Sequence, residues 1–182
     1  MAIPKVCGLE TEYGIFVRGA ENDPVAASSL LVNAYADRLG PRPGWDYEHE
    51  RPSSYARDPD PPAFDGGLDP ELESRLVNTV LRNGARYYVD HAHPELSTPE
   101  VRTARDAVLW DVAGERIVRR SVDIALAHLP PGAEIVVHKN NSDGKGNSYG
   151  CHENYLVDRT VPYGRAVNGV LSQFVSRQVI CG

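Results

Sequence analysis

The sequence predicts an α+β fold in which helices pack against a largely antiparallel sheet. Strand-like and helix-like segments do not alternate strictly along the chain, which disfavours a doubly wound parallel sheet. The last two strand-like segments are joined by a glycine-rich turn, as in an antiparallel pair. With 182 residues, of which 41% are hydrophobic and 24% charged, the chain can form one domain with its own core, or a piece of one.

Composition narrows the range of functions. The net charge of -6 argues against nucleic acid as a partner, because nonspecific nucleic-acid binders need a basic surface. No stretch approaches the ~20 apolar residues of a membrane span, and the first residues lack the apolar core of a signal peptide. Three scattered cysteines, Cys7, Cys151 and Cys181, suit a reducing compartment, where we expect them to be small buried residues. We therefore expect a cytoplasmic protein that binds neither nucleic acid nor a membrane.

The first elements predicted are a strand and a helix. Residues 6–17 are expected to form one strand, on which Glu10 and Glu12 lie two positions apart and so point to the same face. A helix is expected to start at Pro24, capped by Asp23, and to end near Gly40.

A proline-rich stretch, residues 41–70, follows this helix and predicts a long loop. Loops of this length inside a compact domain are uncommon and tend to be functional or mobile. It is either a mobile lid or regulatory element, or a tolerated surface insertion.

The later elements follow from apolar spacing and from glycine and proline signals. A second helix is predicted over residues 70–84, where apolar side chains recur at every fourth position, and a strand over residues 85–91. A long helix is predicted over residues 103–129. Strands over 134–140 and 151–157 are expected to pair through the glycine-rich turn between them.

Acidic side chains are the main chemical signal. On the strand that starts at Ala85, Arg86, Tyr88 and Asp90 share one face, so a cation, a phenol and a carboxylate line up together. Hard cations such as Mg²⁺ prefer oxygen ligands. If the strands adjoin, they supply a basin of carboxylates from Glu10, Glu12, Asp90, Glu95, Glu100 and Glu153.

Two other kinds of site are disfavoured. His91, His93, Cys151 and His152 offer zinc ligands, but the adjacent Cys151 and His152 point apart on a strand, and no C-x-x-C or H-E-x-x-H spacing is present. The glycine-rich stretch after Lys139 lacks the spacing of a P-loop, and a plain hairpin turn explains its composition.

Five motifs in colinear order carry a family resemblance: GLETEYGI, NGARYYVDHAHPELSTPE, DAVLWDVAGERI, KNNSDGKGNSYGCHENYL and VSRQVICG. Over nearly the whole chain they resemble the amino-terminal part of the Pup ligase and Pup deamidase (depupylase) family, which is related to glutamine synthetase. The resemblance implies a glutamine-synthetase-like curved, largely antiparallel sheet packed by helices, and residues 1–182 as the N-terminal part of the catalytic domain.

Two features favour the deamidase over the ligase within this family. The chain has DHAHPE where the ligase resembles DVGSHPE, one residue shorter between Asp90 and Glu95, and its proline-rich stretch is similar to a loop characteristic of the deamidase. The resemblance implies an ATP- and Mg²⁺-dependent hydrolase with Pup and pupylated proteins as partners. It would convert the C-terminal Gln of Pup to Glu and cleave the isopeptide bond that joins Pup to lysine.

The resemblance also implies roles for individual residues. Asp90 would be the catalytic carboxylate, either as nucleophile on the amide carbon or as base for water. The metal ligands implied are Glu10, Glu12, Tyr88, Glu95 and His152, and the nucleotide contacts are Arg86, Ser97 and Thr98.

Family members are several hundred residues long, so the resemblance implies a sheet incomplete at its C-terminal side and a partner in the missing C-terminal part of the same enzyme. Two alternatives to the deamidase remain. One is a Pup–protein ligase that forms the isopeptide bond, and the other is a truncated nucleotide-binding module without turnover.

Overall fold

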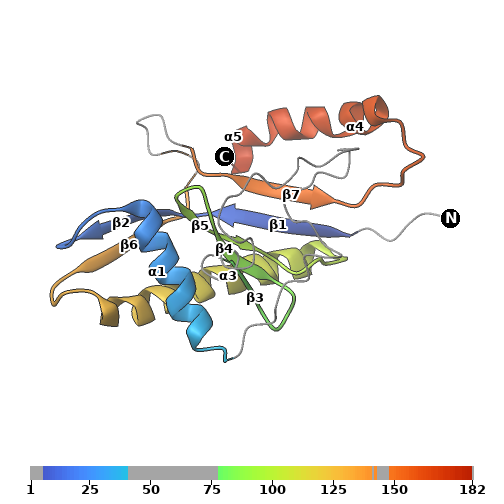
Figure 1. Cartoon of the computed structure of the whole chain (residues 1–182). Coiled ribbons are helices and arrows are strands. Elements are labelled where there is room, and N and C mark those ends of the chain that lie inside the picture. Colours follow the sequence, from blue (N-terminus) through green and yellow to red (C-terminus); the bar gives the residue numbers. More distant parts are fainter. Residues whose placement is uncertain (1–5, 41–77, 141, 143–147, 182) are drawn as a thin grey trace, which may run out of the picture.

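The computed structural model describes residues 6–40, 78–140, 142 and 148–181, and they form antiparallel sheets packed by helices (Figure 1). Five strands pair in the order β3–β4–β5–β1–β7, with bounds Asn78–Val80, Arg86–Asp90, His93–Ser97, Cys7–Glu12 and Cys151–Tyr155. A second sheet pairs β2 (Gly14–Arg18) with β6 (Glu134–His138). Every strand pairing in these ranges is antiparallel, so the predicted α+β fold is confirmed.

Two of the predicted helices form where local signals placed them. Helix α1 spans Pro24–Asp37, and the carboxylate of Asp23 accepts hydrogen bonds from the amides of Val25 (2.9 Å) and Ala26 (3.3 Å). Helix α3 spans Ala104–Ala125 and continues as a 3-10 turn over Leu126–His128. Both N-termini carry the oxygen-bearing cap that satisfies unpaired amides of a first helical turn.

The strand predicted over residues 6–17 is in fact two strands. The chain changes sheets at Tyr13: β1 pairs with β5 and β7, whereas β2 pairs with β6. The Tyr13 amide donates to the carbonyl of Pro94 at 3.0 Å, outside either ladder. An alternation of apolar residues does not reveal such a change of partner, because both strands bury side chains with the same period.

The helix predicted over residues 70–84 is wrong over residues 78–84. Residues 70–77 lie outside the described ranges, as do the proline-rich residues 41–69, but Asn78–Val80 form strand β3. This strand pairs with β4 through a tight turn, in which Leu81 donates to Ala85 and Gly84 has φ 86°. The Asn-Gly pair thus marks a hairpin turn rather than a helix end.

Two strand assignments also need correction. Residues 93–97, for which no element was predicted, form strand β5 beside β4. Strand β7 pairs with β1, not with β6 as predicted. The pairing of β7 with β1 joins segments distant in sequence, which spacing alone does not determine.

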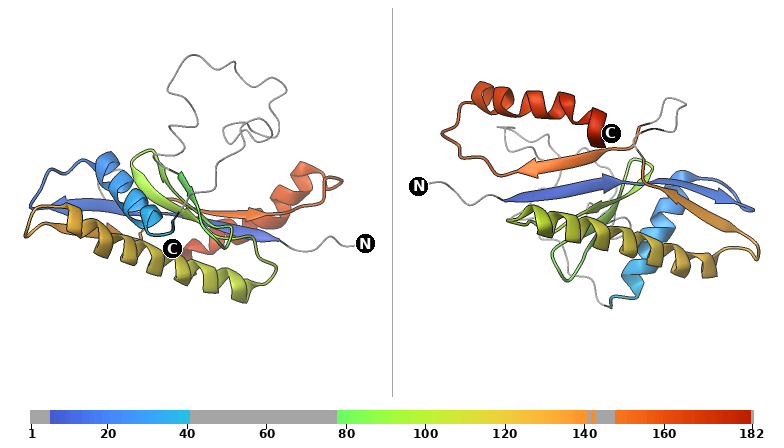
Figure 2. Two further views of the ribbon diagram at one scale, coloured as in Figure 1. Left: turned by 60° about the horizontal axis from the view of Figure 1, so that its bottom comes forward. Right: turned by 180° about the vertical axis from the view of Figure 1, so that it is seen from behind.

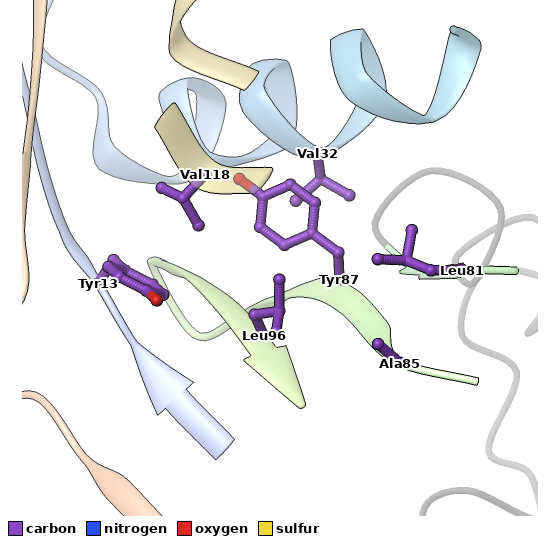
Figure 3. Close-up of a cluster of buried hydrophobic side chains, with 7 residues drawn as sticks. All are labelled: Tyr13, Val32, Leu81, Ala85, Tyr87, Leu96 and Val118. Carbon is purple, nitrogen blue, oxygen red and sulfur yellow. The ribbon is translucent and has the colours of Figure 1, made fainter. Parts of the chain in front are cut away.

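The core lies between the sheets and the two long helices. Figure 3 shows the Tyr87 ring directed toward Val32 of α1 and Val118 of α3, with Leu96 and Tyr13 beside it. A second cluster joins α1 to β2 and β6 around the fully buried Leu31. Helices α1 and α3 therefore cover the face of the sheet that carries Tyr87 and Leu96, and cross one another there (Figure 2).

Strand β7 leads into two further helices at the C-terminal side. Helix α4 spans Tyr163–Ser176 and α5 spans Gln178–Cys181. The Arg177 guanidinium that follows α4 contacts the Glu153 carboxylate on β7. Cys151, expected to be buried, is exposed on this strand.

Candidate functional site

Most of the polar residues singled out in the sequence meet on the sheet face turned away from α1 and α3. Because side chains alternate along a strand, residues that neighbour Tyr87 and Leu96 point to the opposite face. Cross-strand register arranges them in rows. The first row is Arg86, Ser97, Glu10 and His152, the second is Tyr88, Glu95 and Glu12, and the third is Asp90 and His93.

Glu10 lies at the centre of the first row. Its Oε2 is 3.2 Å from Nδ1 of His152, and its Oε1 is 3.4 Å from the hydroxyl of Ser97. The Ser97 hydroxyl also lies 3.3 Å from the Tyr88 phenol. A carboxylate, an imidazole, a hydroxyl and a phenol thus form one connected polar group drawn from four strands.

Glu95 is the buried member of the site, with only 2% of its side chain exposed. Burial raises the pKa of Glu95 to about 7; a hydrogen bond with Tyr88 lowers this pKa, while the charges of Glu10, Asp90 and Glu12 raise it further. Burial also raises the pKa of Tyr88. A buried carboxylate among three others is costly unless a cation or a proton compensates it.

Two overlapping groups have the geometry to hold a cation. The ligand atoms of Glu10, Glu95 and His152 lie within 4.8 Å of one another, and so do those of Glu12, Asp90 and Glu95. Carboxylate oxygens supply most of these ligands, which is the donor set that Mg²⁺ prefers. Both groups share the buried Glu95, and a bound divalent cation would compensate its charge.

Asp90 ends strand β4 at the tip of the β4–β5 hairpin. Its side chain is 41% exposed, and its Oδ1 lies 3.0 Å from Nδ1 of His91. His91 has φ 53°, a left-handed conformation that residues with a Cβ rarely adopt. Asp90 is therefore both accessible to solvent and adjacent to Glu12 and Glu95, which are candidate ligands of a cation.

Arg86 lies at the edge of the polar face, and Thr98 follows the end of β5. The Arg86 guanidinium stacks 4.7 Å from the centre of the Tyr88 ring and donates from Nε to Asn78 at 3.3 Å. Thr98 instead binds the backbone of β1, since its hydroxyl accepts from the Leu9 amide at 3.0 Å. Its hydroxyl is thus engaged in holding β1 to the chain after β5.

Two carboxylates expected in the basin are not in these groups. Glu153 lies between His152 and Asn154 on β7, so it points to the other face, where it contacts Arg177 and accepts from the Tyr155 phenol at 2.5 Å. Glu100 is exposed beyond the end of β5 and belongs to neither of the two groups that could hold a cation. The predicted basin is therefore smaller than six carboxylates.

Sequence reasoning missed two neighbours of Glu12. The Gly150 amide donates to Glu12 Oε2 at 2.9 Å, and His93 Nδ1 lies 3.4 Å from the same oxygen. The His93 ring packs edge-on against Tyr149, with centroids 4.9 Å apart. The alternation His93, Glu95, Ser97 was the available signal, because polar residues at every second position mark one strand face.

Comparisons with known proteins identify one family. The chain matches the family model described as Pup-ligase protein over residues 5–182. It is 50% identical over 184 residues to a depupylase of Acidothermus cellulolyticus, covering 98% of this chain and 36% of that protein. It is 42% identical over 193 residues to a Pup deamidase/depupylase of Mycobacterium tuberculosis, with the same coverage of 98% and 36%.

More distant matches are ligases. A Pup–protein ligase of Bifidobacterium longum is 33% identical over 183 residues, which cover 98% of this chain and 31% of the ligase. A crystal structure of the complex between Pup and its ligase PafA superimposes with a TM-score of 0.68 at 27% identity, covering 98% of this chain and 31% of that one.

The fold is glutamine-synthetase-like, and the free face of its antiparallel sheet carries carboxylates, a phenol and an imidazole. These side chains form an acidic site with the geometry to bind a cation. The chain belongs to the Pup-ligase protein family. It spans about a third of the length of the curated relatives it matches, 36% of the depupylase and 31% of the ligase. None of the helices among the described residues is long and apolar enough to cross a membrane.

Proposed function

We propose that the chain carries the acidic catalytic face of a Pup deamidase/depupylase, an ATP- and Mg²⁺-dependent amide hydrolase. Its reactions are hydrolysis of the side-chain amide of the C-terminal Gln of Pup, and hydrolysis of the isopeptide bond between Pup and a lysine of another protein. The higher identity to proteins named depupylase or deamidase, 50% and 42%, than to a ligase at 33%, supports hydrolysis over ligation.

The observation that carries this proposal is the position of Asp90. Its partly exposed carboxylate ends a strand, and one oxygen lies within 4.8 Å of ligand atoms of Glu12 and Glu95. A carboxylate fixed next to cation ligands can act on an amide carbon held over the same site, either directly or through water.

We assign Asp90 the role of nucleophile. One Asp90 oxygen bonds to the amide carbon, the carbon–nitrogen bond breaks, and the nitrogen takes a proton and leaves as ammonia or as the lysine amine. Water then hydrolyses the acyl-aspartate, which restores Asp90 and releases Pup with a C-terminal Glu. In the alternative role, Asp90 takes a proton from the attacking water and no covalent intermediate forms, so rapid quenching during turnover distinguishes the two.

The other residues of the face bind metal and nucleotide in this proposal. The metal ligands are Glu10, Glu12, Tyr88, Glu95 and His152. Bound Mg²⁺ would supply the positive charge that lets these carboxylates gather and that neutralises nucleotide phosphates. Arg86, Ser97 and Thr98 contact the nucleotide, and of these Ser97 already shares hydrogen bonds with Glu10 and Tyr88. The proposal places the protein, with Pup and pupylated proteins as its partners, in the cytoplasm.

The test uses the complete natural protein that contains this chain, and the 182-residue chain alone for comparison. Each is mixed with ATP, Mg²⁺ and either Pup ending in Gln or a pupylated protein, and products are followed by gel shift and mass spectrometry. Asp90→Asn should abolish both reactions, whereas the matched Asp123→Asn, an exposed aspartate of α3, should leave them unchanged.

The outcomes separate the candidate functions. Release of Pup and conversion of Gln to Glu support the deamidase. Attachment of Pup to protein would identify a ligase instead. ATP binding without either reaction would identify a nucleotide-binding module, and full activity of Asp90→Asn would remove Asp90 from the chemistry.

A further inference from the structure

A buried serine of helix α1 reaches the tip of the hairpin that carries Asp90. Ser28 is 0% exposed, and its hydroxyl donates to the carbonyl oxygen of Ala92 at 2.9 Å. Ala92 and His91 are the two residues between the paired ends Asp90 and His93. The hydrogen bond therefore fixes the turn that joins Asp90 to the next strand.

This contact is unusual for a serine inside a helix. Such hydroxyls commonly donate back to the carbonyl four residues earlier in the same helix. Ser121, a second fully buried serine in the described helices, follows this pattern, since it donates to Ile117 at 2.8 Å. Ser28 instead bonds across 64 residues of sequence, so its hydroxyl links two elements rather than satisfying its own helix.

The turn needs such support because of its backbone. His91, with φ 53°, adopts the left-handed region without being glycine, which costs free energy that the surroundings must offset. The His91 side chain itself is 88% exposed, and it contacts Asp90, its neighbour at the same tip, at 3.0 Å. Helix α1 restrains this tip through the hydrogen bond from Ser28 to the Ala92 carbonyl.

We infer that Ser28 is a positioning residue for Asp90: through its hydrogen bond to Ala92 it holds the hairpin tip so that the Asp90 carboxylate stays beside Glu12 and Glu95. The inference rests on the proposed role of Asp90. A carboxylate that must meet an amide carbon in a defined orientation loses rate steeply when displaced, since about 1 Å of error costs up to about 100-fold.

The test compares Ser28→Ala with Ser121→Ala in the complete natural protein. Both changes remove one hydroxyl from a 0% exposed serine, but only the first frees the hairpin tip. Ser28→Ala should lower kcat for Pup deamidation by about tenfold or more and leave KM for Pup within about twofold, after correction for the folded fraction. Ser121→Ala should leave both unchanged.

Ser28→Cys tests for a simple cavity effect, because its thiol leaves no cavity in place of the hydroxyl and offers only a weak donor. Ser28→Cys should show the loss of kcat seen in Ser28→Ala. In both Ser28 variants, hydrogen exchange at the His93 amide should be faster than in the wild type. Equal kcat in Ser28→Ala and Ser121→Ala overturns the inference while leaving the proposed function intact. Wild-type kcat in Asp90→Asn overturns the proposed function, and the inference with it.

Discussion

Nδ1 of His152 on β7 lies 3.2 Å from Oε2 of Glu10 on β1, and the two residues are direct partners across the antiparallel ladder. They are 142 residues apart in sequence. An imidazole nitrogen and a carboxylate oxygen held at this distance can share a proton or a cation, and the adjoining Glu95 favours the cation.

Removing the charge of Glu10 should weaken metal binding. We expect Glu10→Gln to reduce the affinity for Mn²⁺, used as a probe for Mg²⁺, by about 10- to 100-fold in titration calorimetry. Glu134→Gln is the matched control, since this exposed carboxylate lies on the second sheet, where it pairs with Arg18. Equal affinities in the two variants would contradict the assignment of Glu10 as a ligand.

The metal-free protein should show a pH dependence that originates in Glu95. Burial raises the pKa of Glu95 from 4.5 to about 7, so the folded protein retains a proton that the unfolded chain releases near 4.5. The stabilising effect of this proton is complete below about pH 4.5 and is lost as pH rises through about 7, a change of about 3 kcal/mol.

Urea unfolding with a chelator present measures this effect as the stability difference between the wild type and Glu95→Gln. The wild type should lose stability relative to the variant between about pH 5 and about pH 8. Mg²⁺ should suppress that loss, because a bound cation compensates the carboxylate. A difference that stays constant with pH would show that Glu95 titrates normally.

A side chain at Gly150 should disturb the Glu12 carboxylate. A Cβ at this position would lie 3.0 Å from Glu12 Oε1 and 3.4 Å from His152 Nε2, so Gly150→Ala should shift the Glu12 carboxylate by a few tenths of an ångström. We expect a loss of Mn²⁺ affinity of about tenfold or more. Gly8→Ala is the control, because a Cβ on that residue of β1 meets nothing within 4 Å. Similar affinities in both variants would contradict the close packing around Glu12.

The cap of α1 should contribute measurably to stability. Asp23→Ala removes the acceptor for the Val25 and Ala26 amides, and should lower the free energy of unfolding by about 1 kcal/mol. Glu21→Ala, an exposed change just before the helix, serves as the control in thermal or urea unfolding. Equal stabilities would mean that water replaces the cap without loss.

Most of the candidate site was accessible to sequence reasoning. The face formed by Arg86, Tyr88 and Asp90 follows from the two-residue period of a strand, and the structure has all three on one face. This two-residue period does not determine which strands pair with one another. For this reason Glu153 was assigned to the basin although it points away from it, and His93 was left out although it touches Glu12.

By itself, the sequence determined the elements whose signals are local: α1 with its Asp23 cap, α3 with Thr103, and the alternating faces of β1 and β4. Only the tertiary structure decided that the first strand divides at Tyr13, that residues 78–80 form a strand, and that β7 pairs with β1. Capping and alternation depend on neighbours within one or two turns of chain, whereas strand pairing depends on which distant segment satisfies the backbone hydrogen bonds of each edge.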